Sequence, residues 1–86
     1  MTEGEKALLK CGFEYDSSEY DEQKNITIWY KCENIFMEFS ISSYSTHWTA
    51  NTYYEDDDLP VHLNLDDIKA IALRLEELNN GVMKLD

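Results

Sequence analysis

Two stretches in the middle of the chain alternate apolar and polar side chains, and this alternation is the feature that most constrains the fold. Asn25–Cys32 and Ile35–Ser42 are rich in β-branched and aromatic residues, and only Glu33–Asn34 separates them. A period of two is typical of a strand with one buried face. A two-residue connection forms a hairpin and is too short for a parallel crossover. The sequence therefore predicts an antiparallel meander, with Thr46–Tyr54 as its third long strand.

The parity of the positions assigns side chains to the two faces of this sheet. On one face we expect a core made of Ile26, Ile28, Tyr30, Cys32, Ile35, Met37, Phe39 and Ile41. Trp29 and Phe36 have the opposite parity and point away from that core, and Tyr53 or Tyr54 joins them. Exposed aromatic side chains are enriched at protein interfaces. Trp29 and Phe36 are therefore candidate partner-binding residues, unless the segment after Tyr54 or an N-terminal helix packs over them.

The residues before the meander predict a short helix and a first strand. A capping box at Thr2 and Glu5 begins a helix over about Glu3–Cys11. Phe13–Asp16 then alternates apolar and acidic residues, as a half-solvated strand does. Ser17–Lys24 has the composition of a polar turn region.

The residues after the meander predict a longer helix. Pro60 interrupts the strand pattern, Asn64 is a helix cap, and Gly81 ends the helix. Its apolar stripe is expected to consist of Leu65, Ile68, Ile71, Ala72, Leu75 and Leu78. We therefore expect one α+β domain over residues 1–86. It combines a short N-terminal helix, an antiparallel meander of three to four strands, and a C-terminal amphipathic helix packed on one sheet face.

The charge of the chain is strongly negative and unevenly distributed. Asp and Glu number 18 against 7 Lys and Arg, which gives a net charge of −11. Lys and Arg are missing from Cys32 to Ile68, and a second acidic cluster without bases spans Glu14–Glu22. Such a surface repels phosphates, which argues against direct binding to nucleic acid or to an anionic membrane. A basic protein is the natural partner, although high charge also serves solubility alone.

No group of residues has the spacing of a catalytic or metal site. Cys11, Cys32, His47 and His62 lack the short paired spacings of zinc ligands. The acidic run Glu55–Asp58 lacks the alternating ligands and central glycine of a calcium-binding loop. Nucleophile, phosphate-loop and dinucleotide motifs are missing as well. We therefore expect no enzyme activity, no metal and no cofactor.

The expected location follows from what the sequence lacks. It contains no apolar run of transmembrane length and no signal-peptide pattern. Its two cysteines are too few for a disulfide-stapled scaffold. We expect a cytoplasmic protein with reduced cysteines.

Most of the chain falls into three stretches, GEKALLKCGFEYD, ITIWYKCENIFMEFSI and LPVHLNLDDIKAIALRLEELNNG. Their layout resembles that of the small accessory proteins encoded by tailed phages and related mobile elements. Among those with known roles, small acidic ones resemble DNA-mimic inhibitors, including anti-CRISPR proteins and inhibitors of host DNA-binding enzymes. The resemblance implies a phage protein that acts in the cytoplasm of a bacterial host.

Charge and resemblance together favour a non-catalytic inhibitor or regulator that occupies a basic, nucleic-acid-binding surface of a host or defence protein. Carboxylates would take the place of phosphates and accept hydrogen bonds from Arg and Lys. The predicted anionic residues are Glu14, Asp16, Glu19, Asp21, Glu22, Glu55, Asp56, Asp57 and Asp58. The alternative is an interaction module or homodimer that uses the aromatic face of Trp29 and Phe36. In either case we expect the fold not to depend on Glu55–Asp58.

Overall fold

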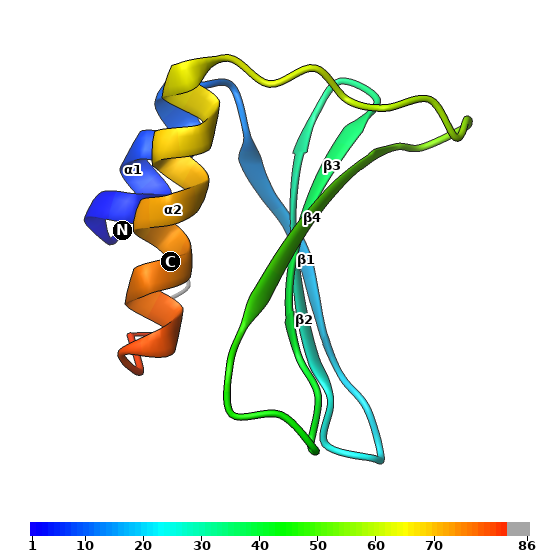
Figure 1. Cartoon of the computed structure of the whole chain (residues 1–86), viewed down its shortest axis with the longest axis vertical. Coiled ribbons are helices and arrows are strands. Elements are labelled where there is room, and N and C mark those ends of the chain that lie inside the picture. Colours follow the sequence, from blue (N-terminus) through cyan, green and yellow to red (C-terminus); the bar gives the residue numbers. More distant parts are fainter. Residues whose placement is uncertain (83–86) are drawn as a thin grey trace.

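Four antiparallel strands in chain order form one sheet, and two helices lie side by side against one of its faces (Figure 1). The computed structural model describes residues 1–82. The elements are α1 (Glu3–Lys10), β1 (Glu14–Tyr20), β2 (Ile26–Cys32), β3 (Ile35–Ile41), β4 (Thr49–Tyr54) and α2 (Leu65–Asn79). This arrangement confirms the predicted α+β class, the meander and both helices. Among these elements, neither helix has the length and apolar character that crossing a membrane requires.

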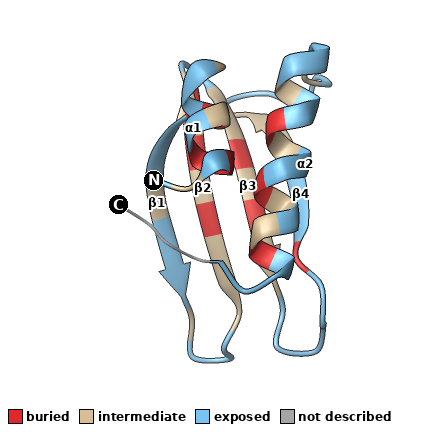
Figure 2. Ribbon diagram, turned by 90° about the vertical axis from the view of Figure 1, so that its left-hand side faces the viewer, coloured by how far each residue is buried: buried red, intermediate tan, exposed pale blue. Residues whose placement is uncertain are grey.

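The central hairpin forms as its alternation predicts. β2 and β3 pair without interruption from Ile26 opposite Ile41 to Cys32 opposite Ile35, and Glu33–Asn34 makes the turn. Glu33 adopts a left-handed backbone conformation with φ of 55°, at a position where such turns favour glycine. The buried positions of β2 and β3 lie behind α1 and α2 (Figure 2), so the core is between the sheet and the helices.

Two strand boundaries differ from the sequence prediction. β1 continues to Tyr20, so the predicted turn region from Ser17 was wrong in its first half. β1 is an edge strand that buries little, and its backbone pairing with β2 leaves no apolar pattern in the sequence. β1 also contains a bulge at Asp16, because Tyr15 and Ser17 pair with consecutive residues of β2. β4 begins at Thr49, three residues later than predicted.

Both helices begin at the predicted caps. The hydroxyl of Thr2 accepts a hydrogen bond from Glu5 N at 3.1 Å, and Glu5 Oε1 accepts one from Thr2 N at 3.0 Å. Asn64 and Asp67 form the same reciprocal pair at the start of α2, at 2.8 and 3.0 Å. These bonds satisfy backbone donors that the first turn of a helix otherwise leaves unpaired.

The predicted apolar stripe of α2 is wrong in about half of its members. Ala70 and Leu78 are buried, whereas Leu65 and Ile68 are 64% and 51% exposed. α2 is rotated about its axis because it packs against α1 as well as against the sheet. The face between those two neighbours carries Arg74, which is fully buried.

A buried polar network joins the two helices to the sheet at Arg74. Its Nε donates to the hydroxyl of Tyr30 at 3.1 Å, and its Nη1 donates to Glu77 at 3.2 Å and to the carbonyl of Val82 at 3.1 Å. The Tyr30 hydroxyl in turn faces Glu5, which is also buried, at 3.5 Å. Burial raises the pKa of Tyr30 to about 12 against the opposing effect of the Arg74 charge. The hydroxyl therefore stays protonated and can bridge the two charges.

Glu77 connects α2 directly to the start of α1. Its carboxylate accepts hydrogen bonds from the hydroxyl of Thr2 at 2.7 Å and from Gly4 N at 2.9 Å. Burial alone would raise the pKa of Glu77, but the hydrogen bonds from Thr2 and Gly4 and the charge of Arg74 lower it instead. The helices approach so closely here that a Cβ at Gly4 would lie 2.8 Å from Arg74 Cα.

Gly4→Ala is expected to destabilise the protein by about 1–3 kcal/mol, because the new methyl group would overlap the backbone of α2 and the carboxylate of Glu77. Urea denaturation followed by circular dichroism measures the free energy of unfolding. Lys6→Ala, at an exposed position of the same helix, is the control and should change it by less than about 0.5 kcal/mol. A Gly4→Ala variant with a higher free energy of unfolding would contradict this, because it would show that α1 and α2 can move apart without loss of stability.

Glu77→Gln is expected to cost about 1–3 kcal/mol at neutral pH, because it leaves Arg74 without its carboxylate. Since the pKa of Glu77 is lowered by folding, this stability is present above the pKa of an unfolded glutamate, about 4.3, and is lost as the pH falls through the folded value. The stability difference between the variant and the wild type should therefore shrink on acidification. Urea denaturation at a series of pH values measures it, with Glu76→Gln, an exposed neighbour, expected to follow the wild type. A difference that stays constant with pH would contradict the assignment.

Candidate functional site

The sheet face turned away from the helices carries three aromatic side chains in mutual contact. We call Trp29, Phe36 and Tyr53 the aromatic cluster. The indole Nε1 of Trp29 donates to the hydroxyl of Tyr53 at 3.0 Å, and the rings of Phe36 and Tyr53 stack with centroids 5.6 Å apart. These contacts fix the orientation of all three rings before any partner binds. Tyr54, the other candidate, pairs with Ile35 and faces the helices.

The aromatic cluster lines a shallow hollow on an otherwise open face. The hollow has a volume of about 230 Å³, and Asp16 and Ser17 of β1 complete its wall. Both helices lie on the opposite face of the sheet (Figure 1). The three aromatic residues are half-buried, so the cluster is partly open to solvent. The predicted orientation of Trp29 and Phe36 away from the core is confirmed.

Carboxylates surround the aromatic cluster on the same sheet face. Strand register places Glu14 opposite Lys31, Glu38 opposite the Trp29 position, and Glu19 nearer the far end, while Asp16 borders the hollow. Lys31 is the base that this face carries. Its Nζ lies 4.9 Å from the centroid of the Phe36 ring and 3.4 Å from a carboxylate oxygen of Glu55. The face is therefore aromatic at its centre and anionic around it. Glu38, which the sequence-based site did not include, has the outward parity that could have identified it.

The nine predicted anionic residues do not lie on one surface. Glu14 and Glu55 lie at one end of the sheet, whereas Asp21 and Glu22 lie in the turn between β1 and β2 at the other end (Figure 1). A strand of seven residues is about 20 Å long, which is the order of their separation. Only a partner that spans the whole sheet could contact both groups.

Some of these carboxylates have structural contacts within their own turns. Asp21 accepts hydrogen bonds from the backbone N–H groups of Gln23 and Asn25, both at 2.9 Å, and from the Asn25 side chain at 3.0 Å. The hydrogen bonds from Asn25 lower the pKa of Asp21. Asp57 accepts one from Leu59 N at 2.9 Å. No Lys or Arg lies near the run Glu55–Asp58 in the sequence, but Lys31 reaches Glu55 across the sheet.

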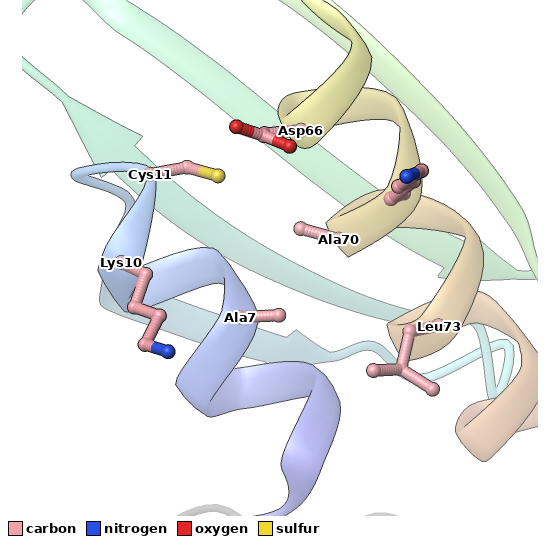
Figure 3. A pocket seen from close by; sticks show the side chains of 7 residues that line it. Ala7, Lys10, Cys11, Asp66, Ala70 and Leu73 are labelled. Carbon is pink, nitrogen blue, oxygen red and sulfur yellow. The ribbon is translucent and has the colours of Figure 1, made fainter.

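A second hollow lies between the two helices, on the side away from the sheet. It measures about 350 Å³, and Figure 3 shows Ala7 and Ala70 pointing toward each other across it, with Leu73 further along α2. Lys10 and Asp66 lie at its margin, near Cys11. Burial raises the pKa of the Cys11 thiol, and the carboxylate of Asp67 raises it further. The thiol is therefore a poor nucleophile at neutral pH.

Within residues 1–82, no three His, Cys, Asp or Glu side chains gather closely enough to hold a metal ion. Cys11 and Cys32 are both free thiols.

Comparisons with known proteins do not assign the chain to a family. No protein-family model, no curated protein and no solved structure matches it. The function is therefore inferred from the surface itself.

Replacing both Asp56 and Asp58 by Asn is expected to leave the melting temperature unchanged or slightly raised. Within residues 1–82 no hydrogen bond or ion pair uses these two side chains, and their removal reduces repulsion between like charges. Glu55→Gln is the comparison and should cost at most about 1 kcal/mol, because its pair with Lys31 is partly exposed. Differential scanning calorimetry measures these effects, and a loss of several degrees in the double variant would show that these acids serve the fold.

Proposed function

We propose that the protein is a non-catalytic binding protein that docks the outer face of its sheet on a basic surface of another protein. The observation that carries this proposal is the aromatic cluster, whose rings contact one another, line an open hollow and are bordered by carboxylates. Aromatic residues at the centre of a surface with charged groups at its margin are typical of protein interfaces.

The chemistry of this face suits Arg and Lys side chains. A guanidinium group can stack on an aromatic ring and donate paired hydrogen bonds to a nearby carboxylate. Lys31 already illustrates the first contact, since its ammonium group lies over the Phe36 ring. An arginine of a partner would find Trp29 and Asp16 beside the same hollow. The net charge of −11 would speed the approach of a basic partner.

A surface that holds nucleic acid is the partner that fits best. Such surfaces present Arg and Lys at the spacing of phosphates, and their occupation by carboxylates blocks the nucleic acid. The resemblance to small acidic phage proteins points to the same role, that of an inhibitor or regulator of a host or defence protein. The protein itself would bind no nucleic acid, because its charge has the wrong sign.

The alternative is an interaction module or homo-oligomer that uses the aromatic cluster without the carboxylates. The stacking of Phe36 on Tyr53 favours it, because pre-ordered aromatic surface alone can supply binding free energy. The two functions differ in their dependence on salt, since only the electrostatic one weakens strongly as ionic strength rises.

The decisive experiment captures partners from a bacterial lysate and then tests the captured protein for DNA binding. Trp29→Ala should abolish capture, whereas Tyr44→Ala, which removes a fully exposed aromatic ring outside this face, should not. The face variant Glu14→Gln, Asp16→Asn, Glu38→Gln should weaken binding at least about tenfold. The helix variant Glu3→Gln, Asp66→Asn, Glu76→Gln has the same net charge and is its control.

The outcomes separate the two functions. The proposal expects the wild-type protein to displace DNA from the captured protein, and this inhibition to fall as salt rises. Equal effects of the face and helix variants would overturn it, because only total charge would then matter. Loss of capture with Trp29→Ala, combined with no effect of the face variant or of salt, would establish the alternative instead.

A further inference from the structure

The two edges of the sheet differ in how they are protected against pairing with another strand. β1 carries Glu14, Asp16 and Glu19 and is interrupted by the bulge at Asp16. Charges and bulges of this kind prevent edge-to-edge association. β4, at the other edge, contains neither a charged residue nor an irregular register with β3. Its residues Thr49–Asn51 are exposed. β4 therefore has the features of a strand that accepts a partner.

The hydrogen-bonding groups at the free edge of β4 can be identified. Glu55 N donates to Asn34 O at 2.8 Å, and these two residues continue the register of β3 with β4. Hydrogen-bonded pairs alternate along an antiparallel ladder, so the odd-numbered residues of β4 bond to β3. The N–H and C=O groups of Ala50, Thr52 and Tyr54 therefore point away from the sheet. In the described loops, no backbone hydrogen bond ends on these three residues.

An uncovered apolar strip of α2 lies beside this edge. Leu65, Ile68 and Ala72 are exposed, although the amphipathic pattern of the helix includes them. Side chains two residues apart on a helix point about 200° apart, so Ile68 and Ala72 point away from Ala70, which faces α1. α2 lies over the β4 side of the sheet (Figure 2). The strip therefore lies on the β4 side of the helix layer.

We propose that two copies of the chain pair through β4, in antiparallel orientation, about a two-fold axis at Thr52. In this register Ala50 of one copy pairs with Tyr54 of the other, and all the outward N–H and C=O groups of both strands find partners. The two sheets join into one continuous sheet. The α2 helices then lie next to each other on the same face, and each covers the strip of the other.

The distribution of charge favours a second copy in this orientation. The acidic run Glu55–Asp58 follows β4, whereas residues 39–54 contain no Asp, Glu, Lys or Arg. Antiparallel pairing places the acidic run of one copy opposite Thr46–Thr49 of the other, a stretch that contains no acidic residue. The two acidic runs are then kept apart at opposite ends of the paired strands. Parallel pairing would bring eight carboxylates together and add the repulsion between them.

The size of the interface predicts a weak dimer. The strand is about 20 Å long, and the sheet and helix layers are about 10 Å apart, so the contact covers roughly 20 × 20 Å on each copy. An interface of this size is typical of weak, transient complexes. Buried area alone does not set an affinity, but a contact this small implies a dissociation constant on the order of 10 µM or weaker.

Sedimentation equilibrium between about 10 µM and 1 mM tests the proposal, because this range brackets the expected constant. Thr52→Pro should leave the fold intact, since the N–H that it removes points outward, and should weaken dimerisation at least about tenfold. Ile68→Lys should do the same by placing two like charges across the axis. Asn51→Pro and Leu73→Lys are the matched controls. The first removes an N–H that bonds to β3 and should destabilise the monomer, and the second adds a charge to the hollow side of α2 and should leave dimerisation unchanged.

Each result bears on the proposal. A wild-type protein that stays monomeric at about 1 mM would overturn it and leave the edge to a different partner. A dimer that survives both Thr52→Pro and Ile68→Lys, with both variants folded by circular dichroism, would overturn it as well. Trp29→Ala should not affect the dimer, because the aromatic cluster lies on the other sheet face. The test is therefore independent of the proposed binding function.

Discussion

The carboxylate of Glu77 is the contact on which the arrangement of the two helices depends. It receives the hydroxyl of Thr2, the backbone N–H of Gly4 and the guanidinium of Arg74, and so attaches the first turn of α1 to the last turns of α2. Because these bonds need close approach, they require a glycine at position 4. The two helices therefore form a single layer, and that layer covers only one face of a four-stranded sheet.

The open face and the free edge are consequences of this layer. A sheet of four strands needs two helices to cover one face, and the chain forms no further helix in its described residues. The aromatic rings of the outer face consequently bury their surface against one another. Trp29 satisfies its own N–H through Tyr53, a contact between side chains that are separated by β3. The result is an ordered aromatic surface that still faces solvent.

How much of this could be predicted from the sequence depends on the signal that each element leaves. β2, β3 and both helix caps follow from local patterns, because burial on one face and capping hydrogen bonds leave direct marks in the sequence. Only the first half of β1 was predicted, because an edge strand that buries few side chains needs no alternation of apolar and polar residues. The rotation of α2 could not be predicted either. Arg74 resembles a surface residue in the sequence. Its burial depends on Tyr30, which is distant along the chain, and on Glu77, a near neighbour whose carboxylate is held by Thr2 and Gly4 of the other helix.

The candidate site shows the same division. The alternation along β2 and β3 correctly predicted that Trp29 and Phe36 point away from the core. The same alternation could have identified Glu38 as a residue of the outer face. The grouping of the acidic residues could not be predicted, because proximity in sequence places Glu14 with Asp21 and the sheet separates them. Conversely, Lys31 and Glu55 are distant in sequence and meet across the strands. Long-range pairing of this kind leaves no local signal.

For the proposed pairing through β4, the bulge at Asp16 would limit the number of chains in one assembly. A sheet with two equally receptive edges can add copies at both ends and grow into a filament. Here the carboxylates and the broken register of β1 close one edge, so any growth through β4 stops when a second copy has been added. Acidic residues on an edge strand that contribute little to the core would in this way restrict the protein to finite assemblies, even at high concentration.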